Sequence, residues 1–450
     1  MSVRIAGAGC CLMDELYPEA DFGSAAFSSL RSRADGDGGL SPGRLVFAAD
    51  VERFAASRGD RRPFAEMLAD LTGGAKPAAE NVGGPSVVAL IHAAQMLEGE
   101  SASVEFRGQR GDDALGERLV ALLRRTPLGI GGYRTGPGPT PSTFVLSDPR
   151  WDGGRGERCF INEIGAAGGF RGGDLDDGFL SADILALGGT ALVPGLHDGL
   201  PEVLGRAKGL GVLTVVNTVF DFRSESADPV GSWPLGPRAK AGSIAQRSDF
   251  GPRLDSPGPR ESYERCDLLI ADRDEALRLS GERELEPALG FLERSGAGAY
   301  LVTRGGDEVL AWASPAGRFA PLARSSLPVS SLAGERLREE FSAGSRSGDT
   351  TGCGDAFAGG VLASLATQLA AAGPGSRAAG RGAAERGSGP LDLVEAAGWG
   401  IAGGAATLFV LGGTYYESRP GEKRAMVERF HEAWLEQTKA GKARSWAMAR

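Results

Sequence analysis

The sequence predicts an α/β protein: a doubly wound, mostly parallel sheet flanked by helices, with a small β-sheet lid beside it. Three observations support this fold class. Short apolar runs bounded by glycine alternate with amphipathic stretches along most of the chain, which is typical of β-α units around a parallel sheet. Two regions break this alternation with strand-like pieces alone. Of the 450 residues, 42% are hydrophobic and 24% are charged, which is enough apolar material for a large core.

The alternation continues along nearly the whole chain, so we expect one domain over residues 1–450. Each short apolar run predicts a buried strand, and each amphipathic stretch predicts a helix that covers the sheet. The expected strands lie at 3–8, 103–107, 184–187, 213–216, 268–270 and 299–303. The expected helices lie at 85–97, 114–124, 200–208, 275–279, 355–369 and 391–411.

The two exceptions are residues 44–51 and 129–164, where strand-like pieces follow one another without helices. Such strands pair antiparallel and form a sheet of their own, because no crossover helix joins them. We therefore expect a lid made from parts of residues 15–75 and 129–166. The pieces in its second part are 133–135, 142–146 and 158–162.

Three further stretches are rich in Gly, Ser, Pro, Arg or Ala, and we interpret them as surface insertions, at 224–259, 324–347 and 373–389. The last segment, 421–450, predicts a charged amphipathic helix. Its apolar residues Met426, Phe430 and Trp434 are spaced at i, i+4 and i+8, so this face is expected to pack on the core.

Charge and cysteine usage narrow the class of protein. The chain has 49 basic and 58 acidic residues, a net charge of −9, and no strongly basic block, which argues against nucleic acid or an anionic membrane as the partner. A small molecule fits better. Five cysteines without a CxxC pair match neither a disulfide framework nor a zinc site, so we expect a cytoplasmic protein.

Two apolar runs resemble targeting or membrane segments at first sight. Residues 5–13 are followed at once by Asp14 and Glu15 rather than by a cleavage site, so they predict a first strand. The run 400–413 is shorter than the roughly 20 residues that span a bilayer. We expect no membrane segment.

The most informative motif is residues 348–355, which have the sequence GDTTGCGD and precede an apolar helix. Small residues at a helix start expose backbone N–H groups that attract anionic oxygen, and Asp355 would stand at the mouth of such a site. Alone, the pattern is better explained by Asp355 capping the helix after a glycine turn.

This motif resembles the C-terminal signature DTxGAGD of the PfkB carbohydrate kinases, the ribokinase-like sugar and nucleoside kinases, with Cys353 in place of alanine. The resemblance implies a ribokinase-like fold. It implies that Asp355 is the catalytic base and that Gly352, Cys353 and Gly354 supply the anion hole. The Cys353 thiol itself is expected only to pack, because it is small and leaves the backbone free.

Other segments match the family in order along the chain, and those for the acceptor come from the N-terminal half. Asp14 after the first strand resembles the aspartate that binds sugar hydroxyls, although an isolated aspartate there is also a common turn residue. Gly83 and Gly84 resemble the glycine pair that approaches the sugar, with Val88 where the family often has asparagine. Asn162 lies in the segment that resembles the lid strand, where an ordinary strand position is an equal alternative.

The segments for the nucleotide come later. Asp272 and Glu275 fall where the family has NxxE, so Glu275 is expected to hold Mg²⁺ through water, unless the pair is only a solvated helix start. The resemblance also implies ATP contacts by further residues, namely Asp272, Thr303, Gly305, Thr350 and Gly403. The element GDDxxG at 111–116 is interpreted as a helix cap.

These observations predict an ATP-dependent kinase acting on a primary hydroxyl of a sugar or sugar-like alcohol, with Mg²⁺ as cofactor. A nucleoside kinase is the alternative, and its base would need an apolar shelf such as Phe106, Tyr133 and Phe144. A non-catalytic ligand-binding relative stays open because Val88 and Asp272 depart from the family. A purely structural protein would leave the preserved motif unexplained. A homodimer through the lid would cover its exposed edge.

Overall fold

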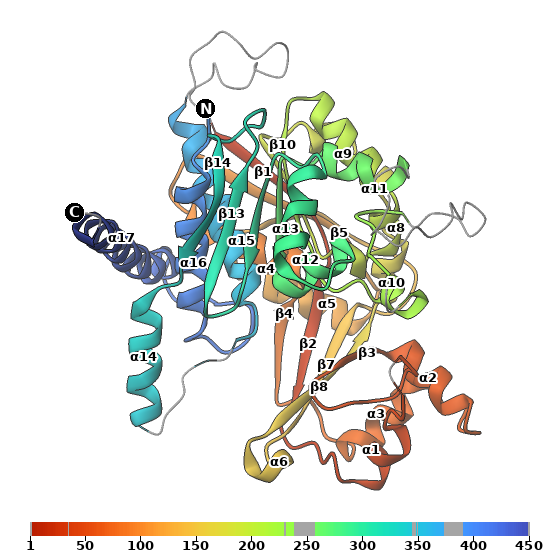
Figure 1. Cartoon of the computed structure of the whole chain (residues 1–450). Coiled ribbons are helices and arrows are strands. Elements are labelled where there is room, and N and C mark those ends of the chain that lie inside the picture. Colours follow the sequence, from red (N-terminus) through yellow and green to blue (C-terminus); the bar gives the residue numbers. More distant parts are fainter. Residues whose placement is uncertain are drawn as a thin grey trace.

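A computed structural model describes residues 2–34, 36–228, 231–237, 257–343, 348, 350–372 and 390–448. The main body is built on a nine-stranded sheet with the strand order β14-β13-β12-β11-β10-β9-β1-β5-β6 (Figure 1). From β12 to β6 the neighbours are parallel, and β13 and β14 are antiparallel additions at one edge. The strands are β1 Val3–Gly9, β5 Ala102–Arg110, β6 Gly129–Thr135, β9 Ile184–Gly188, β10 Leu213–Asn217, β11 Leu268–Asp272, β12 Ala299–Thr303, β13 Glu308–Ala313 and β14 Leu322–Pro328.

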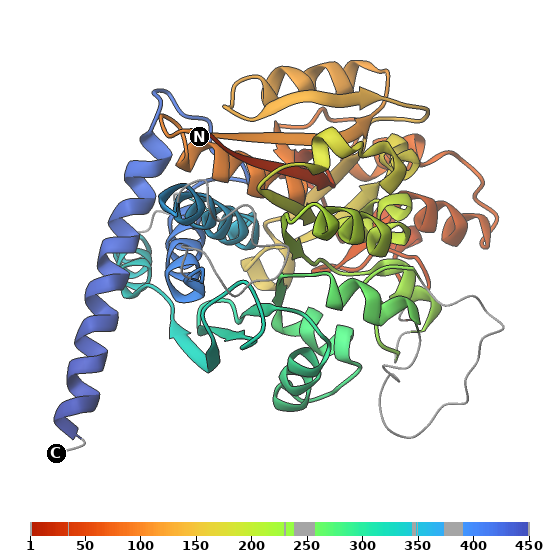
Figure 2. The same ribbon diagram turned by 90° about the horizontal axis from the view of Figure 1, so that it is seen from above.

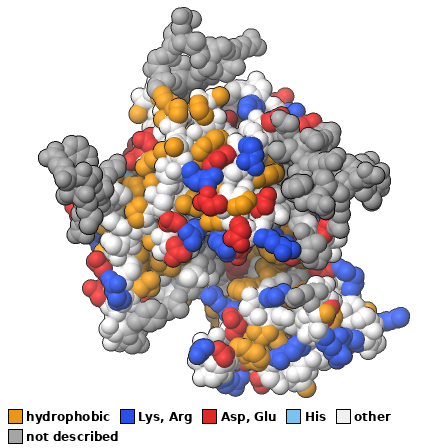
Figure 3. Space-filling model, in the orientation of Figure 1, with side chains coloured by type: hydrophobic (Ala, Val, Ile, Leu, Met, Phe, Trp, Pro, Cys, Tyr) orange, Lys and Arg blue, Asp and Glu red, His pale blue; other side chains and the backbone are white. Residues whose placement is uncertain are grey.

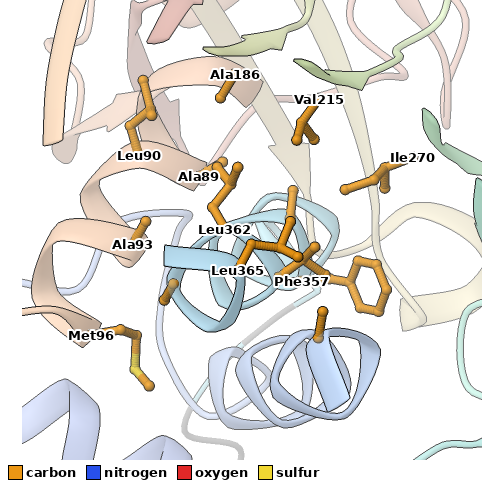
Figure 4. Close-up of a cluster of buried hydrophobic side chains, with 14 of the residues drawn as sticks. Ala89, Leu90, Ala93, Met96, Ala186, Val215, Ile270, Phe357, Leu362 and Leu365 are labelled. Atoms are coloured by element: carbon orange, nitrogen blue, oxygen red, sulfur yellow. The ribbon is translucent and has the colours of Figure 1, made fainter. Parts of the chain in front are cut away.

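Helices cover both faces of this sheet, as a doubly wound fold requires (Figure 2). One face packs against α4 Pro85–Met96, α5 Ala114–Leu123, α15 Cys353–Ala371, α16 Leu393–Thr407 and α17 Glu422–Met448. The other packs against α8 Pro194–Asp198, α9 Leu200–Gly209, α11 Pro257–Glu264, α12 Arg273–Ser280 and α13 Leu285–Arg294. In Figure 4 the apolar side chains of α4 and α15 meet beneath Ala186, Val215 and Ile270 of three adjacent strands. This contact fixes where α15 begins.

A second, five-stranded sheet forms a separate lobe, and we call it the small sheet. Its order is β3-β8-β7-β2-β4, with the strands β2 Leu12–Tyr17, β3 Leu45–Phe47, β4 Ala79–Gly83, β7 Ser142–Asp148 and β8 Glu157–Glu163. One face carries Tyr17, Leu146, Cys159 and Ile161 and packs on the chain's own helices α1 Ala25–Leu30, α2 Ala48–Ala56 and α3 Phe64–Thr72. The chain's own helices therefore cover this face of the small sheet, and the opposite face is left open; the homodimer expected at the sheet edge stays a prediction.

The sequence assigned several segments correctly. The mixed fold with a large, mostly parallel sheet and a smaller sheet is confirmed, and β7 and β8 pair antiparallel as expected. The antiparallel expectation is wrong for β3, which pairs parallel to β8 because the long connection between them carries several helices and strands. Asp113 caps α5 by accepting the N–H of Gly116 at 2.7 Å, and it also binds Thr140. The final helix buries Phe430 and Trp434, with Met426 packed beside them.

Three segments differ from the expectation. Residues 133–135 belong to β6 of the main sheet, because α5 is itself the crossover that makes β6 parallel to β5. The stretch 324–347 contains most of β14 and all of α14 Ser331–Ser342, and its polar composition reflects an edge strand. The small sheet also takes β2 and β4, which the sequence did not separate from the main body. The expected insertion at 373–389 lies outside the described residues.

Acidic and basic side chains are interspersed on the face shown in Figure 3. None of the described helices is both long and apolar enough to cross a membrane.

Candidate active site

The first turn of α15 is built from glycine. Gly352 is the residue before the helix and has φ 76°, a left-handed conformation that favours glycine. A Cβ at this position would lie 2.5 Å from Cα of Gly413, so no larger residue fits. A Cβ on the exposed Gly354 would meet nothing within 4 Å. The Cys353 N–H donates to the carbonyl oxygen of Thr350 at 3.3 Å. The N–H groups of Gly354 and Asp355 have no acceptor within the helix, and the space beside Gly354 is open. Asp349 of the motif lies outside the described residues.

Asp355 is the third residue of this helix and is half-buried. Among the described residues its carboxylate has no hydrogen-bond or ion-pair partner, and burial alone raises its pKa to about 6. The charge of Asp355 reaches two other groups. It helps to raise the pKa of the buried Cys10 thiol, as does Asp14, and it helps to raise the pKa of Glu275. The structure thus brings Asp14, Asp355 and Glu275 to one region at the carboxyl ends of the parallel strands, where open α/β sheets bind ligands.

Asp14 belongs to a polar row on the small sheet. The strand register pairs Asp14 with Asn81 on one side and with Thr143 on the other, and Thr143 pairs with Asn162. Directly paired residues point to the same face, and this face is opposite to the one covered by α1, α2 and α3. Asp14 and Asn162 are two strands apart, about 10 Å. Asn162 is 5% exposed and its Oδ1 has no partner among the described residues.

Gly83 and Gly84 allow the chain to turn tightly beside this row. A Cβ on Gly83 would lie 2.2 Å from Oδ2 of Asp14, so only glycine leaves room for the carboxylate. Gly84 has φ 103°, and a Cβ there would lie 2.7 Å from the carbonyl oxygen of Cys10. Gly83 is therefore adjacent to Asp14, and Gly84 to the backbone of Cys10 and Cys11; their expected approach to a sugar stays a prediction.

A second row on the same face is apolar. Leu16 pairs with Val145, Val145 pairs with Phe160, and Phe160 pairs with Leu45. The polar row ends at Phe47, whose ring meets the ring of Phe222 at 4.6 Å. The sequence missed these residues, because only the register shows that they share a face.

The three aromatic residues expected to form a shelf do not converge. Phe106 and Tyr133 pack together at 5.5 Å in the core of the main sheet. Phe144 lies on the other face of the small sheet, 5.4 Å from Phe64.

Arg158 joins the two lobes. It lies on β8, and its side chain donates to Oγ1 of Thr351 at 3.3 Å, in the loop just before α15. Arg158 shares a face with Phe160 and Asn162, because these residues alternate along the strand. A cation is thus held beside the first turn of α15. In the sequence, the only signal for the position of Arg158 is the alternation of side chains along β8.

The expected nucleotide residues lie at the ends of β11 and β12, where Asp272 pairs with Thr303. Gly305 follows in an exposed turn with φ 58°. Thr350 is exposed beside the first turn of α15. Gly403 is placed differently: it is buried between helices, and a Cβ there would lie 2.7 Å from the carbonyl oxygen of Ala356. Glycine is required at this position because α15 and α16 pack closely here.

Asp272 and Glu275 form a capping box at the start of α12. Glu275 accepts the N–H of Asp272 at 2.9 Å and the hydroxyl of Thr218 at 2.8 Å. Burial and the charges of Asp272 and Asp355 raise the pKa of Glu275 to about 8. The described residues contain no group of three or more His, Cys, Asp or Glu side chains that could hold a metal directly. The carboxyl oxygens of Asp272 and Glu275 nonetheless fit a hydrated Mg²⁺ held through water, and the charge of such an ion would favour the ionised form of Glu275.

No family model matches the sequence, and no curated protein matches it. Solved structures do. The adenosine kinase from Sinorhizobium meliloti is 18% identical, with a TM-score of 0.61, and the match covers 95% of this chain and 99% of that one. The chain has the ribokinase-like fold. Among other structures with this fold are a putative ribokinase II from E. coli in complex with ATP and Mg²⁺ (15% identity, TM-score 0.54, 95% and 100% covered) and a fructokinase from Xylella fastidiosa with bound ATP (17%, 0.55, 96% and 99%). In this ribokinase-like fold the nine-stranded sheet is the main body, and the small sheet extends from the carboxyl end of β1, which leads directly into β2.

Proposed function

We propose that the chain is an ATP-dependent phosphotransferase of the PfkB carbohydrate kinase family that phosphorylates a primary hydroxyl of a sugar or sugar-like alcohol. The observation that carries the proposal is the Asp355 carboxylate, which has no partner among the described residues, sits in a glycine-framed first turn and shares one region with Asp14. A general base works best with a pKa near the working pH, and a pKa of about 6 leaves Asp355 ionised at pH 7.

The reaction follows from these positions. Asp355 accepts the proton of the acceptor hydroxyl, and the hydroxyl oxygen bonds to the γ-phosphorus of ATP as the bond to the bridging oxygen breaks and ADP leaves. Gly352, Cys353 and Gly354 frame the anion hole, where the backbone N–H groups of the first turn and the dipole of α15 stabilise charge on the phosphoryl oxygens. Arg158 adds a cation on the opposite side, from the small sheet.

Mg²⁺ fits the cofactor role, held through water by Glu275 and Asp272. When bound it would neutralise part of the phosphate charge. The E. coli relative in this fold holds ATP and Mg²⁺, which supports both as partners of the present site. Thr303, Gly305 and Thr350 line the expected nucleotide side.

The acceptor would lie on the open face of the small sheet, which thereby acts as a lid. Asp14 and Asn162, about 10 Å apart, can both reach the hydroxyls of one sugar ring. The orphan Oδ1 of Asn162 accepts a hydrogen bond, and a sugar hydroxyl supplies one.

A nucleoside is the second candidate acceptor, and a specific observation favours it. The apolar row of Leu16, Val145, Phe160 and Leu45 lies beside the polar row on the same face, so a ligand with a sugar part and a flat apolar part would contact both. Two of the adenosine kinases with this fold come from Sinorhizobium meliloti and Schistosoma mansoni, the latter with 2-fluoroadenosine.

The test is an ATP-consumption assay against a panel of sugars, sugar phosphates and nucleosides. We expect acceptor-dependent formation of ADP that Asp355→Asn abolishes. ATP consumption in the presence of a sugar but not of a nucleoside indicates a sugar kinase, and the reverse result indicates a nucleoside kinase. If no acceptor raises ADP formation above that of the Asp355→Asn control, the proposed function is wrong.

A further inference from the structure

A lysine is buried behind the first turn of α15. Lys423, the second residue of α17, is 2% exposed, and its Nζ donates to Oγ1 of Thr407 at 3.1 Å. Of the described residues, Thr407 is the only one that hydrogen-bonds this ammonium group. A buried, underpaired ammonium is costly, so a fold that retains one calls for an explanation.

The position of Thr407 connects this charge to the candidate site. Thr407 is the last residue of α16, and its hydroxyl donates in turn to the carbonyl oxygen of Gly403 at 2.9 Å. Gly403 and Gly404 let α16 approach the first turn of α15: a Cβ on them would lie 2.7 Å from the carbonyl of Ala356 and 3.1 Å from that of Cys353. Lys423 therefore stands where α16 ends and α15 begins.

The side chains around Lys423 allow the lysine to stay protonated at neutral pH. From α4 the buried His92 faces it, and burial together with the lysine's charge holds the pKa of His92 well below its ordinary value. Cys353 faces it from α15, and Glu417 from the loop before α17. The ring of Tyr415 lies 5.8 Å from Nζ, and α14 presents Arg336 to the rings of Phe409 and Phe430. Burial lowers the pKa of Lys423 to about 8, so at neutral pH the ammonium form still dominates.

We propose that Lys423 is a positioning residue for phosphoryl transfer: its buried ammonium adds positive potential to the anion hole at the start of α15 and acts through Thr407 and α16. The inference rests on the proposed function. The C-terminal end of α16 carries a partial negative charge and stabilises the ammonium. The N-terminal end of α15 carries a partial positive charge, and the ammonium adds to the positive potential there. Burying this charge lowers the stability of the fold, and its retention is explained by stronger attraction for the transferring phosphoryl group.

The test compares Lys423→Met with Arg424→Met. Methionine keeps the length of the lysine stem and removes the charge, and Thr407 keeps its bond to Gly403. Arg424 is the next residue of α17 and pairs with Glu100 and Glu428 at the surface, so Arg424→Met removes a charge of the same sign without touching α15.

For Lys423→Met we expect a kcat about tenfold lower, less than the 10² to 10³ lost with a direct anion-hole donor, because the ammonium lies one helix behind. The KM values should change less than twofold. Binding of ADP alone should be unchanged, whereas ADP with aluminium fluoride, which mimics the transferring phosphoryl group, should bind about tenfold more weakly. Arg424→Met should equal the parent in each measurement.

Two further measurements separate positioning from mere packing. Lys423→Met should melt at a higher temperature than the parent, because an apolar residue replaces a buried charge. The parent should lose activity as the pH rises through about 8, and Lys423→Met should lack this step. Over the same range the parent should gain stability relative to the variant, since the unfolded lysine binds its proton up to a higher pH than the folded one.

The outcomes are distinct. A parent that phosphorylates no acceptor refutes the proposed function and this inference with it. A parent that is active beside an equally active, folded Lys423→Met refutes only the role of Lys423. If Lys423→Met does not fold, Lys423→Arg decides, because it keeps the charge: parental kcat and parental binding of ADP with aluminium fluoride support the inference, and a tenfold loss of both in a folded Lys423→Arg refutes it.

Discussion

The first turn of α15 and the open face of the small sheet make up the two halves of the candidate site, and they are built in opposite ways. The first turn comes from one contiguous segment, in which Gly352 and Gly354 frame Asp355. The open face is assembled from β8, β7, β2 and β4, so that only the strand register brings Asp14 and Asn162 to the same face, two strands apart. One half is fixed by local backbone geometry and the other by long-range pairing.

The difference assigns different tasks to the two halves. The first turn offers a carboxylate and backbone N–H groups, which serve any phosphoryl transfer and hold no information about the acceptor. The open face offers a polar row beside an apolar row, which distinguishes one acceptor from another. Changes in the first turn should therefore alter kcat, and changes on the open face should alter KM for the acceptor.

The largest effect is expected for Asp355→Asn, which preserves shape and removes the base. Loss of a positioned general base costs about 10² to 10⁴ in rate. ATP should still bind, because its expected contacts lie elsewhere, and at about 100 times its dissociation constant it should stabilise the variant by roughly 2.7 kcal/mol. A turnover assay checks the loss of rate, and thermal melting with and without ATP checks that ATP still binds. Turnover at the parent rate would mean that another group takes the proton.

Gly83→Ala should break the other half instead. The new Cβ would lie 2.2 Å from Oδ2 of Asp14 and must displace that carboxylate. We expect KM for the acceptor to rise about ten- to hundredfold, the loss of one or two charge-assisted hydrogen bonds, with little change in KM for ATP. Gly131→Ala is the matched control, since a Cβ on this strand glycine meets nothing within 4 Å. Equal acceptor KM values for the two variants would contradict the placement of the acceptor.

The same contrast explains what the sequence could predict. The β-α alternation and the motif around Asp355 are local signals, so the central strands of the main sheet, α15 and the final helix are predicted correctly. The row from Asn81 to Phe47 depends on register, which no single strand encodes. Lys423 resembles any solvated lysine of an amphipathic helix, because its burial follows from the way α17 crosses the end of α16. The polar sequence of β14 resembles a loop, because an edge strand needs little apolar surface.

The pH dependence of kcat/KM should report on the first turn of α15, because Asp355 lies there. Burial raises the pKa of Asp355 to about 6, so kcat/KM should fall about tenfold per pH unit below 6. The sign for stability is opposite: the folded state holds this proton at a higher pH than the unfolded chain does, so protonation of Asp355 favours folding as the pH drops through 6. Comparing the melting of the parent and Asp355→Asn from pH 7 to 5 isolates this contribution. A flat kcat/KM down to pH 5 would exclude Asp355 as the base.

The smallest effect is expected for Cys353→Ala, which tests whether the first turn works through its backbone alone. Cys353 supplies an N–H group to the expected anion hole, and alanine supplies the same group with a small side chain that suits a helix start. The thiol is partly exposed and is not disulfide-bonded. Alanine also leaves Lys423 and Thr407 in place, so the potential behind the turn is unchanged. We expect kcat within about threefold of the parent, which is less than 1 kcal/mol in the barrier. Cys353→Leu, which adds bulk at the same position, should lower kcat more, and the comparison shows that space rather than sulfur chemistry is limiting. A hundredfold loss in a folded Cys353→Ala, about 2.7 kcal/mol, would assign the thiol itself to the reaction.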